Sequence, residues 1–284
     1  MVRPKRSLSQ NFLVDHNIRR KLVETLGAGP GDTVLEVGPG HGELSELLVG
    51  RVRRLVLVEK DDRLAPQLAA RWAGRDDVTV VHGDALELDL STLVRDPGPA
   101  APPSPGDPGV LRLISNLPYA ITSPLLFVLL DVEPRPERIV VLLQDEVARR
   151  ITAEPRGKEY GALSVGVRTR ARVEVAFRVG RNAFRPVPGV DSAALVLEPT
   201  VGSGPVEPAV LRRLVRAAFS RRRKQMRTIL RSSPTYGLSA EQAEAVLGGL
   251  GIDPAARPET LAPEQFEALA ARLERLVGSD GEGC

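Results

Sequence analysis

Cysteine and histidine are both scarce in this chain of 284 residues. The only cysteine is Cys284, the last residue. A single terminal cysteine excludes an internal disulfide, a cysteine-based zinc site and a cysteine nucleophile. The three histidines, His16, His41 and His82, are too scattered to predict a metal site, so we expect no bound metal. These two absences remove several classes of enzyme.

Long apolar runs are missing as well. No stretch approaches the roughly 18 to 20 uninterrupted apolar residues of a membrane span. The segment Met1–Arg6 is basic and lacks the apolar run of a signal peptide. With 42% hydrophobic and 26% charged residues, the composition is that of a globular chain that buries a core. We therefore expect a cytoplasmic protein with no membrane partner.

Acidic residues are missing from one segment, residues 212–231. It carries nine basic residues and no Asp or Glu, although the net charge of the whole chain is only +3. Arginine outnumbers lysine 34 to 5 along the chain, but such a composition bias cannot remove acids from one place. Because clustered like charges repel unless an anion is bound, we interpret the segment as a surface that faces nucleic acid or phosphate rather than as a solvated helix face. Its densest part is Arg221, Arg222, Arg223 and Lys224.

Apolar runs and helical stretches alternate from residue 33 to residue 144. Strands are predicted at 33–37, 54–58, 78–81, 111–115 and 138–143, and helices at 43–49, 63–72 and 123–130. Such repeats are typical of a parallel sheet with crossover helices. Residues 163–179 and 193–197 are predicted to be strands without a helix between them, which indicates a final antiparallel hairpin. The pattern predicts an α/β, Rossmann-like fold with a mostly parallel seven-stranded sheet and an antiparallel end.

Two segments rich in proline and glycine interrupt this pattern. Six of the twelve residues of 97–108 are proline, so we expect a surface loop there. The second break, 199–208, precedes a region without strand patterns. Helices are predicted in that region at 210–219, 223–231, 240–247 and 263–276. We therefore divide the chain into an α/β domain, 1–201, and a small all-α domain, 202–284.

A glycine-rich turn joins the first predicted strand to the first predicted helix. Gly38, Gly40 and Gly42 permit a tight turn and let a ligand approach the backbone. A dinucleotide-binding fingerprint requires Gly-x-Gly-x-x-Gly, and Glu43 occupies the position of its third glycine. The spacing therefore disfavours a pyrophosphate ligand.

Acidic residues follow the next two strands. Glu59, followed by Lys60, is placed to accept the hydroxyls of a ribose. Asp84, followed by Ala85, is placed to accept an adenine amino group, although either acid alone is equally well explained as a helix cap or a surface charge. A glycine turn and two acids without a phosphate cradle favour S-adenosylmethionine over NAD as the ligand.

The fourth strand ends in Asn116, Leu117, Pro118 and Tyr119. A plain strand-ending turn is the alternative to a site. The Asn116 side-chain oxygen and the Leu117 carbonyl are suited to accept the two hydrogens of an exocyclic amine, and Tyr119 to stack on the base. Those hydrogen bonds expose the nitrogen lone pair for in-line attack on a methyl sulfonium, so positioning and electrostatics supply the rate without a strong base.

In these motifs the chain resembles the ribosomal RNA small-subunit adenine dimethyltransferase family. The resemblance runs over nearly the whole length, in the segments 8–15, 34–45, 116–119, 144–148, 158–164, 184–192, 218–224 and 251–254. It implies transfer of methyl groups from S-adenosylmethionine to the N6 amines of two adjacent adenines near the 3′ end of 16S RNA. It also implies a monomer that acts on the immature small ribosomal subunit.

The resemblance further implies roles for individual residues. The residues implied at the methyl-donor site are Gln10, Asn11, Leu13, Gly38, Gly40, Glu59, Lys60, Asp84, Ala85 and Asn116. Residues 10–13 are expected to cover that site as a lid. Phe184 is expected to stack on the target base opposite Tyr119, although an aromatic residue in such a loop is as often a core anchor. Gly189 replaces the lysine usual in that loop, which puts one RNA phosphate contact in doubt.

Two other functions remain open at this stage. A macrolide-resistance methyltransferase, which modifies one adenine of 23S RNA, shares the fold and the Asn-x-Pro-Tyr motif. The segments 158–164 and 251–261 fit the small-subunit family better. A non-catalytic ribosome-assembly factor is the second alternative, and the joint presence of Glu59, Asp84 and Asn116 argues against it, because a pure binding protein has no use for a donor pocket.

Overall fold

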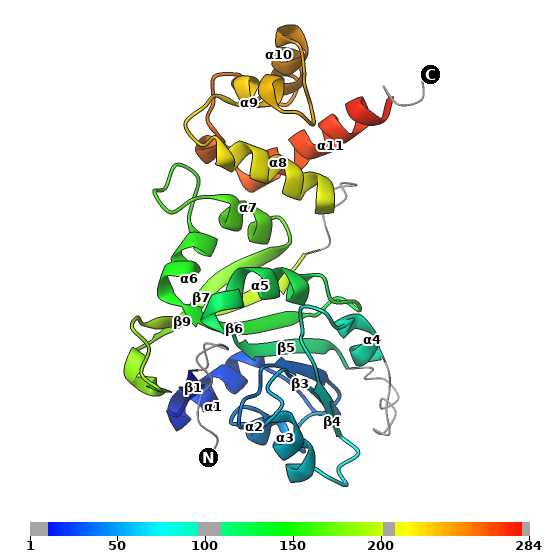
Figure 1. Ribbon diagram of the computed structural model, residues 1–284, viewed down its shortest axis with the longest axis vertical. Coiled ribbons are helices and arrows are strands. Elements are labelled where there is room, and N and C mark those ends of the chain that lie inside the picture. The colour runs from blue at the N-terminus through cyan, green and yellow to red at the C-terminus, as the bar shows by residue number, and fades with distance from the viewer. Residues whose placement is uncertain (1–10, 96–108, 201–207, 280–284) are drawn as a thin grey trace. The chain divides into compact units, whose positions relative to one another are not determined.

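The computed structural model describes residues 11–95, 109–200 and 208–279. The chain divides into two compact units (Figure 1). Unit 1 comprises Met1–Ala148 and Arg172–Pro199, and unit 2 comprises Arg149–Ala171 and Thr200–Cys284. The proline-rich segment 97–108, expected to be a surface loop, lies outside the described residues.

Unit 1 is built on a mixed sheet. In the described part of the chain, seven strands form this sheet in the order β4-β3-β2-β5-β6-β9-β7. Their bounds are Thr33–Val37 (β2), Arg54–Glu59 (β3), Val78–His82 (β4), Leu111–Asn116 (β5), Arg138–Gln144 (β6), Ala171–Val179 (β7) and Ser192–Pro199 (β9). Strands β2 to β6 run parallel, and β9 pairs with β6 antiparallel. The predicted Rossmann-like sheet with an antiparallel end is thereby confirmed.

Helices and a small second sheet complete unit 1. The helices are α1 (His16–Leu26), α2 (Ser45–Leu48), α3 (Ala65–Arg71), α4 (Leu90–Arg95), α5 (Thr122–Leu130) and the first part of α6 (Asp145–Thr152), with 3₁₀ turns η2 (Tyr119–Ile121) and η3 (Arg181–Ala183). Strands β1 (Phe12–Leu13) and β8 (Phe184–Arg185) pair antiparallel in a separate two-stranded sheet.

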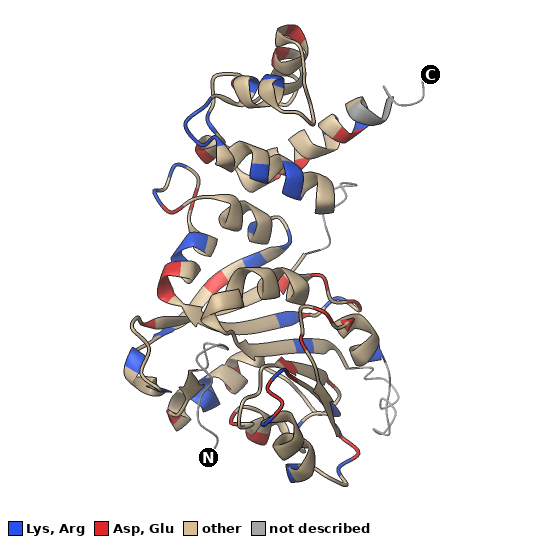
Figure 2. Cartoon of the chain, in the orientation of Figure 1, with Lys and Arg blue, Asp and Glu red and all other residues tan. Residues whose placement is uncertain are grey.

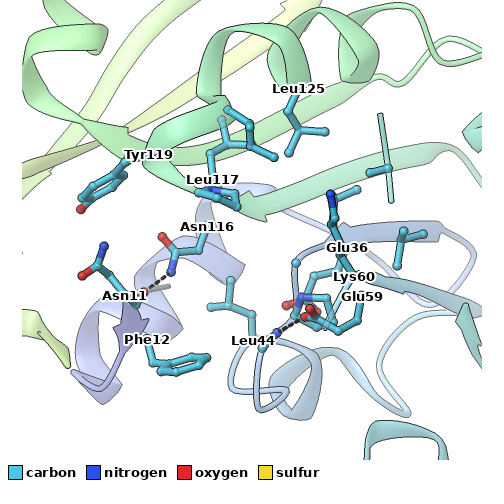
Figure 3. A pocket seen from close by; sticks show the side chains of 18 of the residues that line it. Asn11, Phe12, Glu36, Leu44, Glu59, Lys60, Asn116, Leu117, Tyr119 and Leu125 are labelled. Atoms are coloured by element: carbon cyan, nitrogen blue, oxygen red, sulfur yellow. Dashed lines mark hydrogen bonds between the residues drawn. The ribbon is translucent and has the colours of Figure 1, made fainter. Parts of the chain in front are cut away.

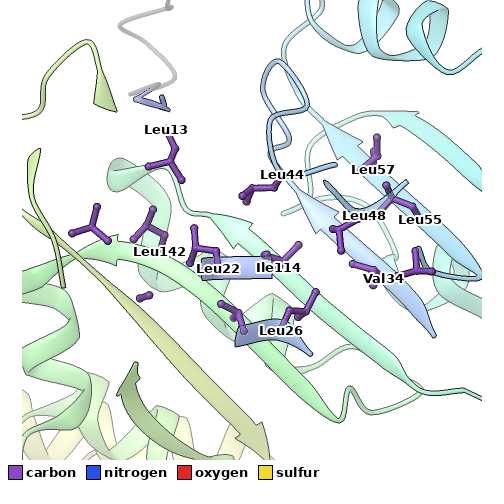
Figure 4. Packing of buried hydrophobic residues seen from close by; sticks show 14 of the residues in the cluster. Leu13, Leu22, Leu26, Val34, Leu44, Leu48, Leu55, Leu57, Ile114 and Leu142 are labelled. Atoms are coloured by element: carbon purple, nitrogen blue, oxygen red, sulfur yellow. The ribbon is translucent and has the colours of Figure 1, made fainter. Parts of the chain in front are cut away.

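Helix α1 shows how local sequence signals and burial act together. Asp15 caps its first turn, since its Oδ1 accepts hydrogen bonds from the backbone N–H of Asn17 at 2.9 Å and of Ile18 at 3.1 Å. Gly27 ends the helix with a φ of 65°. The buried Leu22 and Leu26 join the hydrophobic cluster that includes Ile114 of β5 and Leu142 of β6 (Figure 4). Burial of such a leucine side chain stabilises the fold by about 1.5 to 3 kcal/mol.

Unit 2 is helical in its described residues. Its helices are α7 (Ala162–Arg168), α8 (Pro208–Ser220), α9 (Met226–Ser232), α10 (Ala240–Gly248) and α11 (Pro263–Ser279), with the 3₁₀ turn η4 (Pro258–Thr260). Its core includes Tyr160, whose hydroxyl donates to the Leu261 carbonyl at 2.8 Å, and Phe266, which stacks on Phe219.

Two sequence-based expectations differ from the structure around residue 160. The boundary drawn at 201/202 assigns 149–171 to the α/β domain, whereas the structure groups these residues with the helical unit, because Tyr160 and Val165 pack into its core. The predicted strand over 163–179 is wrong in its first part, where α7 forms. Valine favours strands, but the packing of Val165 into the helical core overrides that preference in α7.

No helix in the described ranges is long and apolar enough to span a membrane.

Candidate functional site

A cavity of about 180 Å³ opens at the carboxyl ends of the parallel strands in unit 1. Strands β2 and β5 are neighbours at the centre of the sheet, where the strand order reverses, and ligands bind at such a position in open α/β sheets. The cavity gathers the segments that follow β2, β3, β4 and β5, together with β1. The expected site residues that line it are Asn11, Leu13, Gly38, Gly40, Glu59, Lys60, Asp84, Ala85, Asn116, Leu117, Pro118 and Tyr119.

Two expected residues are not found in that lining. Gln10 lies outside the described residues. Phe184 is 0% exposed and belongs to the hydrophobic cluster of unit 1, where β8 pairs it with Leu13. The expectation that Phe184 stacks on the target base is therefore corrected, because this ring has no exposed face, and its place is that of a core anchor.

The glycine-rich turn has different requirements at its two ends. A Cβ on Gly42, where φ is 83°, would lie 2.5 Å from Cη2 of Trp72, so a side chain is excluded by the packing of the turn on α3. A Cβ on Gly38 would meet no atom within 4 Å, and Gly38 lines the cavity. The lack of a side chain at Gly42 therefore lets the turn pack against α3, while the lack of one at Gly38 leaves open the space that a ligand needs.

Glu59 is tied to the same turn. Its Oε2 accepts a hydrogen bond from the Gly40 N–H at 2.9 Å, and its Oε1 accepts one from the Asp61 N–H at 2.8 Å. The side chain is buried, and burial raises its pKa above the usual value while these backbone bonds oppose the rise. A carboxylate has about four acceptor positions, so Glu59 can still accept hydrogen bonds from a ligand.

Asp84 and Lys60 form an ion pair at the edge of the cavity. The hydrogen bond from Lys60 is the main cause of the lowered pKa of Asp84. Asp84 Oδ1 also accepts from the Leu86 N–H at 3.0 Å, which makes it the turn-forming residue after β4. Asp84 is therefore charged and held in one orientation. It stabilises the turn after β4 and also lines the cavity.

Asn116, at the end of β5, is oriented by the segment before β1. Its Nδ2 donates to the Asn11 carbonyl at 2.9 Å (Figure 3). Because the amide nitrogen is used in this way, the side-chain oxygen is the group that can accept from a ligand. The adjoining backbone is also held, since the Leu117 N–H donates to the Leu142 carbonyl at 2.9 Å.

Tyr119 is oriented by Ser192, which lies far along the chain in β9. Its hydroxyl and the Ser192 Oγ lie 2.7 Å apart in a hydrogen bond, and Ser192 is fully buried at the start of β9. Burial raises the pKa of Tyr119, so its phenol stays neutral. The ring lines the cavity beside Asn116, and Figure 3 shows both on the side away from Glu59 and Lys60.

Several lining residues were not identified from the sequence. They are Glu36, Val37, Pro39, Glu43, Leu44, Val58, Gly83, Ala120, Ile121 and Leu125. Phe12 also lines the cavity, and it stands inside the segment 10–13 that was expected to cover the site. Glu36 is one acid in the middle of an apolar strand, and an unpaired acid in a buried strand is the signal that marks it.

The basic cluster lies in the turn between α8 and α9, which is marked as basic in Figure 2, and not at the start of a helix. Arg222 Nε donates to Glu259 Oε2 at 2.7 Å, and its other nitrogens donate to the carbonyls of Gly157 and Lys158. Arg221 bonds to Ser232. Arg223 and Lys224 are exposed, and in the described residues their side chains make no ion pair or hydrogen bond. The cluster therefore contains one arginine that holds the helical unit together and two cations that face solvent.

Comparisons with known proteins identify one family. A family model described as ribosomal RNA adenine dimethylase matches residues 1–274. A ribosomal RNA small subunit methyltransferase A from Moorella thermoacetica is 41% identical over 275 residues, which cover 95% of this chain and 93% of the relative. The protein of the same name from Geobacter metallireducens is 39% identical over 281 residues, or 98% of each chain.

Two solved structures have similar folds. The 23S rRNA methyltransferase ErmE is 28% identical with a TM-score of 0.63, covering 93% of this chain and 100% of that one. A dimethyladenosine transferase from Plasmodium falciparum is 24% identical with a TM-score of 0.75, covering 91% of this chain and 95% of that one. The second likeness shows the fold alone.

Proposed function

Because this chain belongs to the ribosomal RNA adenine dimethylase family, we propose that it methylates the N6 amines of two adjacent adenines near the 3′ end of 16S RNA. The product is N6,N6-dimethyladenine, and the methyl donor is S-adenosylmethionine. The observation that carries this proposal is one cavity with carboxylates at one side and Asn116 and Tyr119 at the other. The names of relatives at 36 to 41% identity support the small subunit as the substrate, in preference to 23S RNA.

The residues present fit S-adenosylmethionine. The space above Gly38 admits a ligand, the Glu59 carboxylate is placed for ribose hydroxyls, and Asp84 is placed for the adenine amino group. No cluster of phosphate-binding cations lines the cavity among the described residues, which agrees with a donor that carries no phosphate. When bound, this donor supplies an electrophilic methyl group on a sulfonium centre.

On the acceptor side, the chain has to hold one amine. The Asn116 Oδ1 and the Leu117 carbonyl accept the two amine hydrogens, and the Tyr119 ring stacks on the adenine. These hydrogen bonds turn the nitrogen lone pair out of conjugation with the base and toward the methyl group. The hydrogen bonds to Asn11 and Ser192 orient the side chains of Asn116 and Tyr119 before the RNA binds. This fixed orientation of the acceptor groups accelerates the transfer.

Proton removal needs no dedicated base. The nitrogen becomes cationic when it takes the methyl group, and it then loses its proton to water. Tyr119 keeps its own proton because burial raises its pKa, so it acts as a stacking surface and not as a base. After the first transfer the nitrogen keeps one hydrogen, so in a second transfer one of the two oxygen acceptors holds that hydrogen while the Tyr119 ring again stacks on the base.

The RNA is held by exposed cations of the helical unit, above all Arg223 and Lys224. They bind phosphates of the surrounding RNA, whose contacts offset the few kcal/mol needed to take a base out of its stack. We place the reaction in the cytoplasm, on the immature small subunit, with the protein as a monomer.

Primer extension on 16S and 23S RNA from cells that lack the protein tests the substrate. We expect loss of the dimethyladenine stop in 16S RNA alone. A loss confined to 23S RNA would establish the macrolide-resistance activity instead. Unchanged modification of both RNAs would leave a non-catalytic assembly factor.

Calorimetry with the purified protein tests the donor site separately. The wild-type chain should bind S-adenosylmethionine, and Glu59→Ala should weaken that binding by about 1.5 to 3 kcal/mol through loss of a charge-assisted hydrogen bond. The control is Glu46→Gln, because Glu46 is an exposed acid that does not line the cavity. Equal affinity in the wild type and the Glu59 variant would show that the donor binds elsewhere.

A further inference from the structure

Three glutamate side chains line the same cavity: Glu36 of β2, Glu43 after the glycine-rich turn and Glu59 of β3. Glu59 has two backbone N–H donors, as described above. Glu36 differs, because it is 2% exposed and its hydrogen bond comes from a hydroxyl, the Ser45 Oγ of α2 at 2.6 Å. The proposed reaction assigns no part to Glu36.

Among the residues that the structure describes, no positively charged group acts on Glu36. On the neighbouring strands, its register partners are Leu57 of β3 and Ile114 of β5, which are apolar. The charged groups that act on it are the other two carboxyls, Glu43 and Glu59. In the described residues, Glu36 makes no ion pair. Lys60 also lines the cavity, but its ammonium group is paired with Asp84.

A carboxyl group in this position keeps its proton in the empty cavity. Burial disfavours the charged form, and two neighbouring carboxyls disfavour it further. These causes, burial first, raise the pKa of Glu36 to about 8, against the opposing hydrogen bond from Ser45. At neutral pH, Glu36 is therefore mostly a neutral acid while no ligand is bound.

We propose that Glu36 gives up its proton when the cationic methyl donor enters the cavity and takes a proton back when the neutral product replaces it. The O–H bond of the carboxyl breaks, the proton passes to the buffer, and the carboxylate faces a ligand of net positive charge. Methyl transfer removes the sulfonium charge, so the product no longer stabilises that carboxylate. The inference rests on the proposed donor and adds to it a charge-based preference of the pocket for donor over product.

The sign of the pH dependence follows from linkage. A bound cation lowers the pKa of Glu36, so the liganded state binds fewer protons and donor affinity rises with pH. For one proton the rise is at most about tenfold per pH unit, and it levels off as the pH passes the pKa of about 8 that Glu36 has without a ligand. Product affinity changes little over that range.

Calorimetry in two buffers of different ionisation enthalpy, phosphate and Tris at pH 7, counts the protons released. We compare S-adenosylmethionine with S-adenosylhomocysteine, which has the same amino and carboxyl groups but a neutral sulfur. The wild-type protein should release more protons with the donor than with the product. Glu36→Gln should abolish that difference while donor still binds, and Glu46→Gln, an exposed acid of α2, should keep it.

Infrared difference spectra of the wild-type protein provide a second measurement that needs no variant. Donor binding should remove a protonated carboxyl band, and product binding should leave it in place. Equal proton counts in the wild type and Glu36→Gln, or an unchanged band, would overturn this inference and leave the proposed function intact. Failure of the wild-type protein to bind donor at all overturns the proposed function and this inference with it.

Discussion

Asn116 and Tyr119 are the first and last residues of one four-residue motif, yet each is oriented by a distant part of unit 1. Asn11, 105 residues away, accepts from Asn116, and Ser192, 73 residues away, bonds to Tyr119. A four-residue motif therefore does not make the acceptor site by itself. Its geometry depends on β1 and on the start of β9, so substitutions outside the motif should change the transfer step.

For Asn116→Ala, we expect methyl transfer to fall by about a hundredfold or more, the size of loss seen when one fixed polar group is removed from an active site. Donor affinity should change much less, because the side-chain oxygen is assigned to the acceptor amine. Single-turnover methylation of RNA and calorimetry with the donor measure the two effects. Near-normal transfer would contradict the proposed part of Asn116.

Asn116→Asp gives a sharper comparison, since it keeps the size of the side chain. It places a carboxylate oxygen where Nδ2 now donates to the Asn11 carbonyl. Two oxygens then face each other, so the side chain should turn and transfer should be lost as in the alanine variant. Full activity of this variant would mean that the Asn11 bond does not set the orientation.

Ser192→Ala should reduce kcat/KM for RNA by about fivefold, which corresponds to the loss of one hydrogen bond of about 1 kcal/mol. Donor affinity should be unchanged, because Ser192 acts through the Tyr119 ring. Tyr119→Phe removes the same bond from the other side, so the double variant should be no worse than either single variant. Additive losses would show that Ser192 supports the fold and not the ring.

Which site residues could be predicted follows from how each is built into the fold. Glu59, Asp84 and Asn116 were predicted because the ends of parallel strands meet at one edge of a sheet. Glu36 was not predicted, although an acid in an apolar strand is a visible signal, because the strand pattern does not show which buried positions face a cavity. Phe184 was misplaced because exposure depends on the pairing of β8 with β1, a contact between segments about 170 residues apart that no local pattern encodes.

At the scale of elements, the strands and helices with strong local patterns were predicted within a few residues, as were α8, α10 and α11. Helix α1 was not among the predicted elements, although Asp15 and Gly27 mark its two ends. Helix α7 was predicted as strand because its valines carry a strand preference that packing overrides. The conformation of α7 therefore depends on tertiary contacts that no local pattern encodes, whereas α1 carries local signals at both ends that make it predictable.

Gly42→Ala tests how the glycine-rich turn packs on α3. The new Cβ would need a left-handed backbone and would lie 2.5 Å from Trp72 and 3.1 Å from Leu68. We expect the free energy of unfolding to fall by about 2 to 5 kcal/mol, from backbone strain and overpacking together. Chemical denaturation measures this loss.

Gly74→Ala is the matched control for that variant. Gly74 has a φ of 78°, and a Cβ there meets no atom within 4 Å, so it carries the backbone cost alone, about 1 to 2 kcal/mol. A loss for Gly42→Ala no larger than that of the control would show that Trp72 moves aside and that the turn is not held by this contact.

At the scale of the whole molecule, the candidate cavity and the basic segment belong to different units. The cavity is built entirely from unit 1, whereas the acid-free segment 212–231 belongs to unit 2. The family predicted from the motifs is confirmed. The placing of RNA contacts on the helical unit remains a prediction, and within the cluster the structure separates Arg222, which is bound internally, from Arg223 and Lys224.

The double variant Arg223→Glu/Lys224→Glu should weaken RNA binding and make it less dependent on salt, while the melting temperature and donor affinity stay unchanged. When a phosphate contact is lost, fewer counterions are released on RNA binding. The slope of log K against log salt concentration should therefore fall in magnitude by about 1 to 2. Arg222→Glu should instead lower the melting temperature, because it breaks the Glu259 ion pair and removes the side-chain hydrogen bonds to the carbonyls of Gly157 and Lys158.

A matched charge reversal on α11, Arg272→Glu/Arg275→Glu, separates position from net charge, because both side chains are exposed on the same unit. Filter binding over a series of salt concentrations measures affinity and slope for all three variants. If the α11 variant loses as much affinity as the variant at 223 and 224, net charge alone explains the effect. If the variant at 223 and 224 keeps the wild-type slope, the turn between α8 and α9 does not contact RNA phosphates and the proposed RNA surface is wrong.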